Sequence, residues 1–308
     1  MSEEKETHYA VPFEIPPAKT DHIKRKMFDL PYANLSEAQK LDIYWPEDGD
    51  GPFPVIVSIH GGAFMGGDKR DIQISSMLRA LKRGYCVVGV NYRMSGEAKF
   101  PKLVHDVKAA IRWIRANASQ YLFDPNKIAT WGGSAGGYQS LMAGVSTHVP
   151  ELDDLSLGNA EQPSHVQAVV DWFGPTDFLK MDEQLAESGL AHGEDEDHNG
   201  SDSPESLLLG NKITLIPDLV RSANPETYIH PNVPPFFIQH GKLDDIVPHQ
   251  QSVNFAAKVR QIAGNERVYL ELIEGAGHGD RKFELVKNVN KVLDFLDQHL
   301  KVKKQRKG

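Results

Sequence analysis

Short apolar runs rich in β-branched residues alternate along this chain with stretches whose apolar residues recur at helical spacing. Clear runs occupy residues 55–59, 166–173 and 268–273, and a helical stretch follows Pro101. Alternation of this kind predicts a mostly parallel sheet with helices on both faces. We therefore expect an α/β fold.

One stretch interrupts this alternation. Residues 178–234 lie between two expected strands and contain an acidic, Gly- and Ser-rich segment at 192–204. A long insertion inside a compact domain is usually functional, often as a lid. We find no internal repeat and no linker, so the sequence predicts a single domain over residues 1–308 with a lid insertion at about 178–234.

The charge balance argues against some classes of partner. The chain has 34 Lys and Arg against 42 Asp and Glu, a formal net charge of -8, whereas general nucleic-acid binders use excess basic residues to contact phosphates. The same balance argues against binding to an anionic membrane surface, and no apolar stretch approaches the roughly 18 residues of a spanning helix. Residues 1–6 are charged and no apolar signal-peptide core follows them, so we expect a cytoplasmic protein.

A glycine-rich turn at 132–137 carries the motif G-x-S-x-G around Ser134. It stands between a short apolar run and a helical stretch, the context in which this motif holds a nucleophile. Glycines two residues before and after the serine let strand and helix pass closely, which pushes the hydroxyl into the open at the helix N-terminus. The helix dipole there favours developing negative charge. The motif alone also fits a structural turn, so the assignment of Ser134 as nucleophile depends on partners elsewhere in the chain.

Those partners are a base and a carboxylate that orients it. In the fold that carries this motif the chain order is Ser, then Asp or Glu, then His. The adjacent Asp244 and Asp245 follow an apolar run, and His278 lies in a Gly-rich loop before the last helical stretch. Both loops are expected at the carboxyl edge of the sheet, where α/β proteins assemble their sites.

A further glycine-rich turn, residues 60–64, follows the run 55–59. Consecutive small residues let backbone amides point at one place, which is what the oxyanion of a tetrahedral intermediate requires. The expected donors are the amides of Gly62, Ala63 and Ala135. His60 is expected to support the turn rather than to titrate in catalysis.

With these motifs the chain resembles the bacterial carboxylesterases that carry an HGG oxyanion motif, akin to the hormone-sensitive-lipase and feruloyl-esterase-like branches of the α/β hydrolases. The segments that carry the resemblance are residues 60–64, 132–137, 171–177, 203–208, 234–248 and 275–279. They cover nearly the whole chain from about Asp42 onward. Two departures are Ala63, which replaces the third glycine of the usual HGGG, and the lack of a long N-terminal helical cap.

The resemblance implies the α/β-hydrolase fold, with a mostly parallel eight-stranded sheet, helices on both faces and a small insertion or lid. It also implies a serine carboxylesterase that forms an acyl-enzyme on Ser134 and hydrolyses short-acyl or aryl esters, including acetylated or feruloylated carbohydrates. Such chemistry requires no metal and no organic cofactor. Homodimers are common in this family, so a homodimer is expected here.

The acid of the triad is assigned largely from the resemblance. Asp244 matches the family pattern H-G-x-x-D-x-x-V-P, whereas Asp245 is expected to be a turn residue that caps the next helix. Asp171 and Asp177 compete only weakly and are expected to hold the loop after their strand. The predicted triad is therefore Ser134, Asp244 and His278.

Residues that choose the substrate are harder to predict. Phe64, Met65, Tyr138 and the insertion 178–234 are candidates for the walls of the substrate pocket. Two other classes of function remain open: a serine peptidase or amidase of related fold, and a non-catalytic ligand-binding α/β hydrolase. The second usually lacks a triad member, whereas all three are present here.

The segment Asp195-x-Asp197-x-Asn199-Gly200 resembles the start of a calcium loop. The glutamate that should close such a loop at its twelfth position is missing, because Ser206 stands there and Glu205 comes one place early. A solvated acidic loop is the better interpretation.

Overall fold

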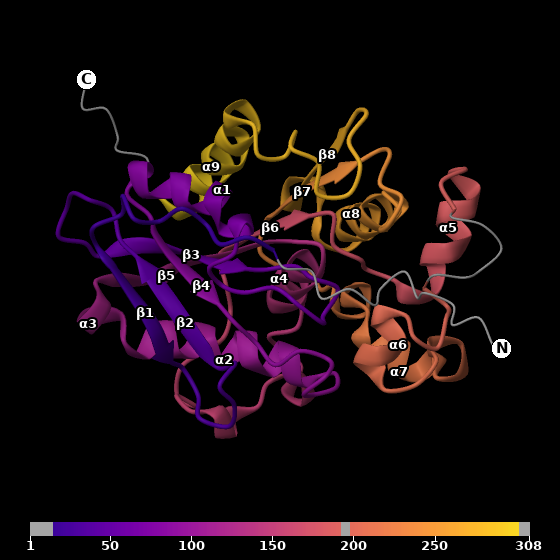
Figure 1. Cartoon of the computed structure of the whole chain (residues 1–308), viewed down its shortest axis with the longest axis horizontal. Helices are drawn as coiled ribbons and strands as arrows, with labels where there is room; N and C mark the ends of the chain where they lie inside the picture. Colours follow the sequence, from indigo (N-terminus) through magenta and orange to yellow (C-terminus); the bar gives the residue numbers. More distant parts are fainter. Residues whose placement is uncertain (1–14, 192–197, 302–308) are drawn as a thin grey trace, which may run out of the picture.

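The computed structural model describes residues 15–191 and 198–301 of the chain, and an open sheet forms its centre (Figure 1). Within these residues the sheet has eight strands in the spatial order β1-β2-β4-β3-β5-β6-β7-β8. β2 pairs antiparallel with both β1 and β4, and every other neighbouring pair is parallel. The strands are β1 (Lys26–Pro31), β2 (Lys40–Tyr44), β3 (Phe53–Ile59), β4 (Cys86–Val90), β5 (Phe123–Gly133), β6 (Ala168–Trp172), β7 (Phe236–Gly241) and β8 (Val268–Ile273).

The central strands are apolar because both faces of the sheet are covered. All five residues of β4 and of β6 are buried, as expected for parallel strands between two helical layers. Successive residues of a strand face opposite sides of the sheet, so Val57 packs in one core cluster and its neighbour Ile56 in another. The predicted α/β class and the eight-stranded, mostly parallel sheet are thus confirmed.

Helices divide between the two faces of the sheet. One core cluster joins α2 (Lys102–Ala116), α4 (Ala135–Val145) and α8 (Gln250–Ala263) to the sheet. The other joins α9 (Val286–Leu300) and the region of α1 (Ser75–Leu78), which lie together at the top of Figure 1. Helices α2, α8 and α9 are amphipathic and turn their apolar stripes to these layers, whereas every residue of α4 is buried.

Two elements differ from the sequence-based expectation. The sequence of residues 72–82 predicts one continuous helix, whereas the structure divides this segment into η1 (Ile72–Ile74), α1 and η2 (Arg79–Arg83). The segment ends at Gly84, which has the left-handed conformation with φ 77°. Strand β1 was not predicted because its residues are exposed or half-buried at the edge of the sheet and so form no apolar run.

The described part of the insertion 178–234 is helical. It contains η5 (Phe178–Lys180), α5 (Met181–Glu187), α6 (Pro204–Leu209), η6 (Ile213–Leu215), α7 (Pro217–Ala223) and η7 (Pro225–Tyr228). Its buried residues Phe178, Leu208, Ile213 and Val220 pack in the same core cluster as α2, α4 and α8. This part of the chain therefore shares the hydrophobic core of the domain, at the side of the molecule where α5, α6 and α7 are labelled in Figure 1.

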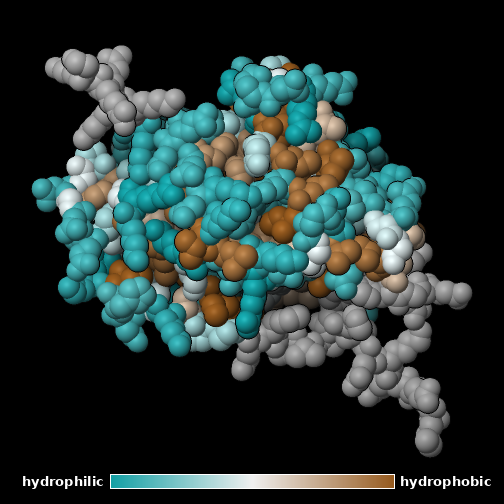
Figure 2. Space-filling view, turned by 90° about the horizontal axis from the view of Figure 1, so that it is seen from above, coloured by the Kyte–Doolittle hydropathy of each residue, from teal (hydrophilic) through white to brown (hydrophobic). Residues whose placement is uncertain are grey.

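The remaining short helices are α3 (Ala118–Tyr121), η3 (Pro150–Leu152), η4 (Leu155–Leu157) and η8 (Asn265–Arg267). None of the helices in the described residues has both the length and the apolar character needed to cross a lipid bilayer. Figure 2 views the molecule from above and shows a mostly hydrophilic surface on which apolar residues gather in patches near the middle of the face.

Candidate active site

Ser134 occupies a strained turn between β5 and α4. Its backbone angles are φ 54° and ψ −124°, which a non-glycine residue rarely adopts. A Cβ atom on Gly132 would lie 2.3 Å from the backbone of Gly136, and one on Gly136 would lie 2.1 Å from the carbonyl oxygen of Ile59. The two glycines of the motif are therefore required by contact between backbones, as the sequence predicts.

The loops after β7 and β8 bring the other two predicted triad residues to this turn. His278 Nε2 lies 3.0 Å from Ser134 Oγ, and His278 Nδ1 lies 2.9 Å from Asp244 Oδ2. The serine hydroxyl can thus donate to Nε2 while the Nδ1–H donates to the carboxylate. This is the geometry by which a histidine takes the proton of an attacking hydroxyl.

Asp244 is held as an anion by its surroundings. The backbone amides of Ile246 and Val247 donate to its Oδ1 at 3.0 and 2.8 Å. Burial alone raises the pKa of this carboxyl, but the charge of His278 and hydrogen bonds from His240 and His278 outweigh burial and hold the pKa well below its usual range. Sequence reasoning did not identify His240 as a partner of Asp244, although their Nε2 and Oδ2 atoms are 3.2 Å apart.

The other aspartates considered for this role face elsewhere. The Asp171 carboxylate accepts a 2.9 Å hydrogen bond from the amide of Gly174, and burial raises its pKa well above the ordinary value. Asp177 accepts a 3.0 Å hydrogen bond from the side chain of Asn224. Both therefore hold the loop after β6, and the carboxylate that contacts His278 is that of Asp244.

The turn after β3 lies directly against Ser134. Gly62 and Ala63 both have positive φ, 123° and 53°, and the turn is closed by the amides of Met65 and Gly66, which each donate to Gly62 O at 2.9 Å. Within the described part of the chain, no acceptor bonds the amides of Gly62 and Ala63. Both residues line the cavity that contains Ser134, so these amides are available to an oxyanion.

Two side chains, those of Gln73 and His60, stabilise the turn of residues 60–64. Gln73 accepts the amide proton of Gly61 at 2.9 Å, and it also lines the cavity. His60 is buried and its ring stacks on Tyr92 with 4.5 Å between centroids. Burial lowers the pKa of His60, so it is neutral at ordinary pH, in agreement with a supporting role.

The cavity around Ser134 has a volume of about 410 Å³ and mostly apolar walls. Trp172, the last residue of β6, and Phe173, which follows it, form part of the wall. The ring of Phe173 lies 4.7 Å from the rings of both His278 and Phe283. The other lining residues are Ile15, Ile59, Gly62, Ala63, Gln73, Met77, Gly133, Ile246, Gly279, Asp280 and Glu284. A largely apolar pocket with a few convergent polar groups is typical of a small-molecule site.

The residues predicted to choose the substrate are not among those that line this cavity. Phe64 is turned into the core by its positive φ of 63°, and its ring packs against that of Tyr138 at 5.3 Å. Tyr138 is fully buried and donates to the carbonyl of Ala223 at 2.7 Å, and Met65 is likewise absent from the wall. Of the described residues of the insertion, none lines the cavity, whereas Ile15, upstream of β1, does.

The aromatic wall was missed although its signal is visible in the sequence. Trp172 and Phe173 stand at the carboxyl end of β6, the edge of the sheet where the sequence predicts the site. In the sequence they appear only in the segment 171–177 that resembles the family, which by itself predicts no contact with substrate. Met77 and Phe283 carry no such signal, since they reach the cavity from elements whose helical spacing predicts only core packing.

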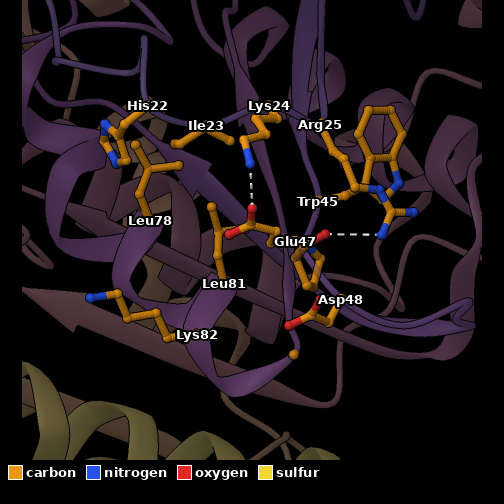
Figure 3. Close-up of a pocket in the computed structure, with 12 residues that line it drawn as sticks. His22, Ile23, Lys24, Arg25, Trp45, Glu47, Asp48, Leu78, Leu81 and Lys82 are labelled. Atoms are coloured by element: carbon orange, nitrogen blue, oxygen red, sulfur yellow. Dashed lines mark hydrogen bonds and ion pairs between the residues drawn. The ribbon is translucent and has the colours of Figure 1, made fainter.

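A larger cavity of about 500 Å³ lies away from Ser134, beside β1, β2 and η2 (Figure 3). Three of its charged side chains already have partners: Lys24 Nζ lies 2.8 Å from Glu47 Oε1, and Arg25 donates to the carbonyl of Pro46 at 3.0 Å. Ser134 and His278 do not line it, so size alone does not identify the reactive site.

Metal-ligating side chains do not gather in the described residues: no group of three or more His, Cys, Asp or Glu there is arranged to hold an ion. Asp195 and Asp197 of the possible calcium loop lie outside the residues that the structure describes. The cysteine Cys86 is buried, and burial raises the pKa of its thiol well above the ordinary value, which makes it unreactive.

Two protein-family models match this chain. The family model BD-FAE matches residues 41–259, and the model of the prolyl oligopeptidase family matches residues 216–303. The probable carboxylic ester hydrolase LipM of Mycobacterium tuberculosis is 33% identical over 246 residues, which are 79% of this chain and 54% of that protein. The chain thus spans about half the length of the curated relatives it matches.

Two solved structures resemble the chain over most of its length. A truncated carbohydrate esterase from gut microbiota has a TM-score of 0.81 and 30% identity, covering 92% of this chain and 99% of that one. A bifunctional GH43-CE protein of Bacteroides eggerthii has a TM-score of 0.78 and 32% identity, covering 89% of this chain and 35% of that one. The eight-stranded fold and the family match over residues 41–259 lead to one conclusion: the chain belongs to the BD-FAE family of α/β hydrolases.

Proposed function

We propose that this protein is a serine carboxylesterase that hydrolyses short-acyl or aryl esters, including acetylated or feruloylated carbohydrates. The observation that carries the proposal is the hydrogen-bonded series Ser134–His278–Asp244 at the wall of an apolar cavity. In this geometry Ser134 is the nucleophile, His278 the base and Asp244 the carboxylate that orients it.

In the first half of the reaction Ser134 Oγ attacks the ester carbonyl and gives its proton to His278 Nε2. The carbonyl oxygen becomes an oxyanion, which the amides of Gly62, Ala63 and Ala135 stabilise. Asp244 keeps the ring of His278 in the tautomer that can accept the proton and stabilises the resulting imidazolium. His278 then protonates the alkoxide oxygen as the bond to the alcohol breaks, which leaves an acyl-enzyme.

In the second half a water molecule gives its proton to His278 and attacks the acyl carbonyl. The same amides hold the second oxyanion, and the imidazolium returns its proton to Ser134 Oγ as the acid leaves. Each proton is thus taken and returned at Nε2 of one histidine. Apart from the substrate and water, the chain supplies every group that this cycle uses.

The surroundings of Ser134 support an apolar or aryl ester. Trp172, Phe173 and Phe283 line the cavity. Two leucines close to the site in sequence are exposed: Leu243, which precedes Asp244, and Leu285, which follows the lining residue Glu284. A carbohydrate as the alcohol part is supported by the similarity to the carbohydrate esterase from gut microbiota. An apolar acyl group in the cavity with a polar alcohol outside it is the arrangement we propose.

A serine peptidase is the second candidate, and one observation favours it. The prolyl oligopeptidase model matches residues 216–303, which include Asp244 and His278. The same triad can cleave amides, so paired ester and anilide substrates with the same acyl group would separate the two. We expect turnover of the ester to exceed that of the anilide by several orders of magnitude.

Labelling with a fluorophosphonate tests the proposal and the non-catalytic alternative together. We expect stoichiometric labelling of the wild type, detected by intact mass, with the adduct on the peptide that carries Ser134. Ser134→Ala and His278→Ala serve as controls that should remain unlabelled. A wild type that takes no label would support a ligand-binding protein instead.

We also propose that the protein is a cytoplasmic homodimer, as expected from the sequence and its resemblance. Light scattering on a size-exclusion column tests the assembly, and fractionation of the cells that produce the protein tests its location.

A further inference from the structure

A buried ion pair in the insertion contacts the loop that carries Asp244. His198 is 3% exposed and Glu205, in the first turn of α6, is 4% exposed. The two meet with His198 Nδ1 3.1 Å from Glu205 Oε2. None of the proposed catalytic steps uses either residue. Burial of a charged pair costs desolvation free energy, which is offset only when the pair is close and its other polar atoms are hydrogen-bonded.

Both ends of this pair are fixed to neighbouring helices. The carboxylate of Asp182, in the first turn of α5, accepts the backbone amides of His198 and Asn199 at 2.9 and 2.8 Å. On the other side, Ser203 caps α6 by accepting the amide of Ser206 at 3.1 Å. The imidazole is therefore held in one orientation by two short helices of the insertion.

The second ring nitrogen of His198 points out of the insertion. Its Nε2 lies 2.7 Å from the carbonyl oxygen of Ile246. A carboxylate and a carbonyl can only accept hydrogen bonds, so both ring nitrogens must carry protons to satisfy both partners. Burial lowers the pKa of His198, but the charge and hydrogen bond of Glu205 raise it more, to about 9. The residue is therefore an imidazolium at neutral pH.

Ile246 belongs to the turn that orients the triad carboxylate. Its own amide donates to Asp244 Oδ1, as does the amide of Val247. The next carbonyl in the turn, that of Val247, lies 2.7 Å from Nε2 of His240. Two successive carbonyls of the loop that carries Asp244 are thus bound by two buried histidines. His240 lies in β7 and His198 in the insertion.

We propose that His198, held by Glu205, is a positioning residue for the triad: by binding Ile246 O it fixes the turn whose amides aim Asp244 at His278. The insertion thereby fixes the position of the loop that carries Asp244. This inference rests on the proposed hydrolase function. It assigns no contact with substrate to His198 or Glu205.

The test uses variants that leave no buried charge without a partner. In His198→Met/Glu205→Gln the donor to Ile246 is lost, whereas in His198→Gln/Glu205→Gln a side-chain N–H can still reach that carbonyl. We expect kcat for a p-nitrophenyl ester to fall about tenfold to a hundredfold in the first, with KM nearly unchanged, because small misplacements of catalytic groups have effects of this size. The second variant should recover most of the loss.

Two comparisons separate positioning from a general loss of stability. His105 on α2 is a matched control, since it is also buried and its Nε2 lies 2.9 Å from a backbone carbonyl, that of Glu151, away from the site. His105→Met should lower the melting temperature without lowering kcat. In an Asp244→Ala background the His198→Met/Glu205→Gln change should lower kcat by less than about twofold, because residues that act through one another have non-additive effects.

The outcomes are distinguishable. An active wild type with kcat unchanged in His198→Met/Glu205→Gln overturns the positioning role and leaves the esterase proposal intact. If His198→Met/Glu205→Gln lowers kcat by the same factor with and without Asp244, the positioning role is also overturned, since His198 would then act by another route. A wild type that hydrolyses no ester overturns the esterase proposal and this inference together.

Discussion

His278 Nε2 lies 3.0 Å from Ser134 Oγ although 144 residues separate the two along the chain. The contact exists because β5, β6, β7 and β8 are parallel neighbours, so that the loops after their carboxyl ends meet at one edge of the sheet. The loops after β5, β7 and β8 thus bring the three residues of the triad together.

Asp244→Asn should abolish most of the activity without unfolding the protein. The amide keeps the shape of the carboxylate but cannot stabilise the imidazolium, and kcat is expected to fall by about 10⁴. Asp245→Asn is the control, and its effect should be far smaller because the carboxylate that contacts His278 belongs to Asp244. Equal losses in the two variants would contradict the assignment of the acid. Steady-state kinetics with circular dichroism spectra measures both.

Gly136→Ala should destabilise the turn at Ser134. Its new methyl group would lie 2.1 Å from Ile59 O, where backbone must move, and we expect a loss of roughly 1–3 kcal/mol or more in the free energy of unfolding. Gly96→Ala is the matched control, since no heavy atom lies within 4 Å of the added carbon. Urea denaturation compares the two, and an equally stable Gly136→Ala protein would show that the turn does not depend on this contact.

Ile15 should influence the size of the acyl group that is accepted. It lines the cavity, and the segment after it is fixed by the hydrogen bonds from Ile72 to Pro16 and from Ala18 to Arg70, both 2.7 Å. Ile15→Trp should lower kcat/KM for longer acyl chains on the order of tenfold relative to acetate, because a pocket wall that is too close excludes additional methylenes. Ile72→Trp, an exposed neighbour outside the cavity wall, should leave the chain-length profile unchanged. Identical profiles for Ile15→Trp and wild type would exclude Ile15 from the acyl site.

Tyr138→Phe should change stability and leave substrate preference unchanged. The hydroxyl is buried and donates to Ala223 O, so its removal leaves that carbonyl unpaired at a cost of about 1–3 kcal/mol. The chain-length profile on p-nitrophenyl esters should match that of the wild type. A changed profile would return Tyr138 to the substrate pocket, where the sequence placed it.

The His198–Glu205 pair should make stability depend on pH in the alkaline range. The pKa of His198 is raised from its ordinary value of about 6.5 in the unfolded chain to about 9 in the native state. The native state therefore holds a proton that the unfolded chain has lost, and the stabilisation, complete at lower pH, is lost as pH rises from about 6.5 through about 9. Melting temperatures of wild type and His198→Gln/Glu205→Gln should converge over this range. A constant difference between them would show that His198 does not titrate there.

Much of the site could be predicted from sequence because its chemistry is local. The glycines around Ser134, the turn 60–64 and the loops of Asp244 and His278 are short motifs at the ends of strands, and strand ends can be inferred from apolar runs. Strand β8 lies at the predicted residues 268–273.

The walls of the cavity could not be predicted in the same way. Met77 and Phe283 line the cavity of Ser134 from segments far from that residue in the sequence, and their apolar spacing gives the same signal as ordinary core packing. Phe64 was misplaced for a backbone reason: its positive φ turns the ring away from the cavity and towards Tyr138. The contact of His198 with Ile246 joins the insertion to a loop 48 residues away, and no local pattern indicates it.

The most direct test of the account is the hydrolysis of a series of p-nitrophenyl esters of increasing acyl length by wild type and Ser134→Ala. The account predicts turnover by the wild type, with a preference set by the cavity of about 410 Å³, and turnover at the background rate for Ser134→Ala. Equal turnover by both proteins, or a wild type inactive on every ester in the series, would contradict the assignment of Ser134 as the nucleophile of an esterase.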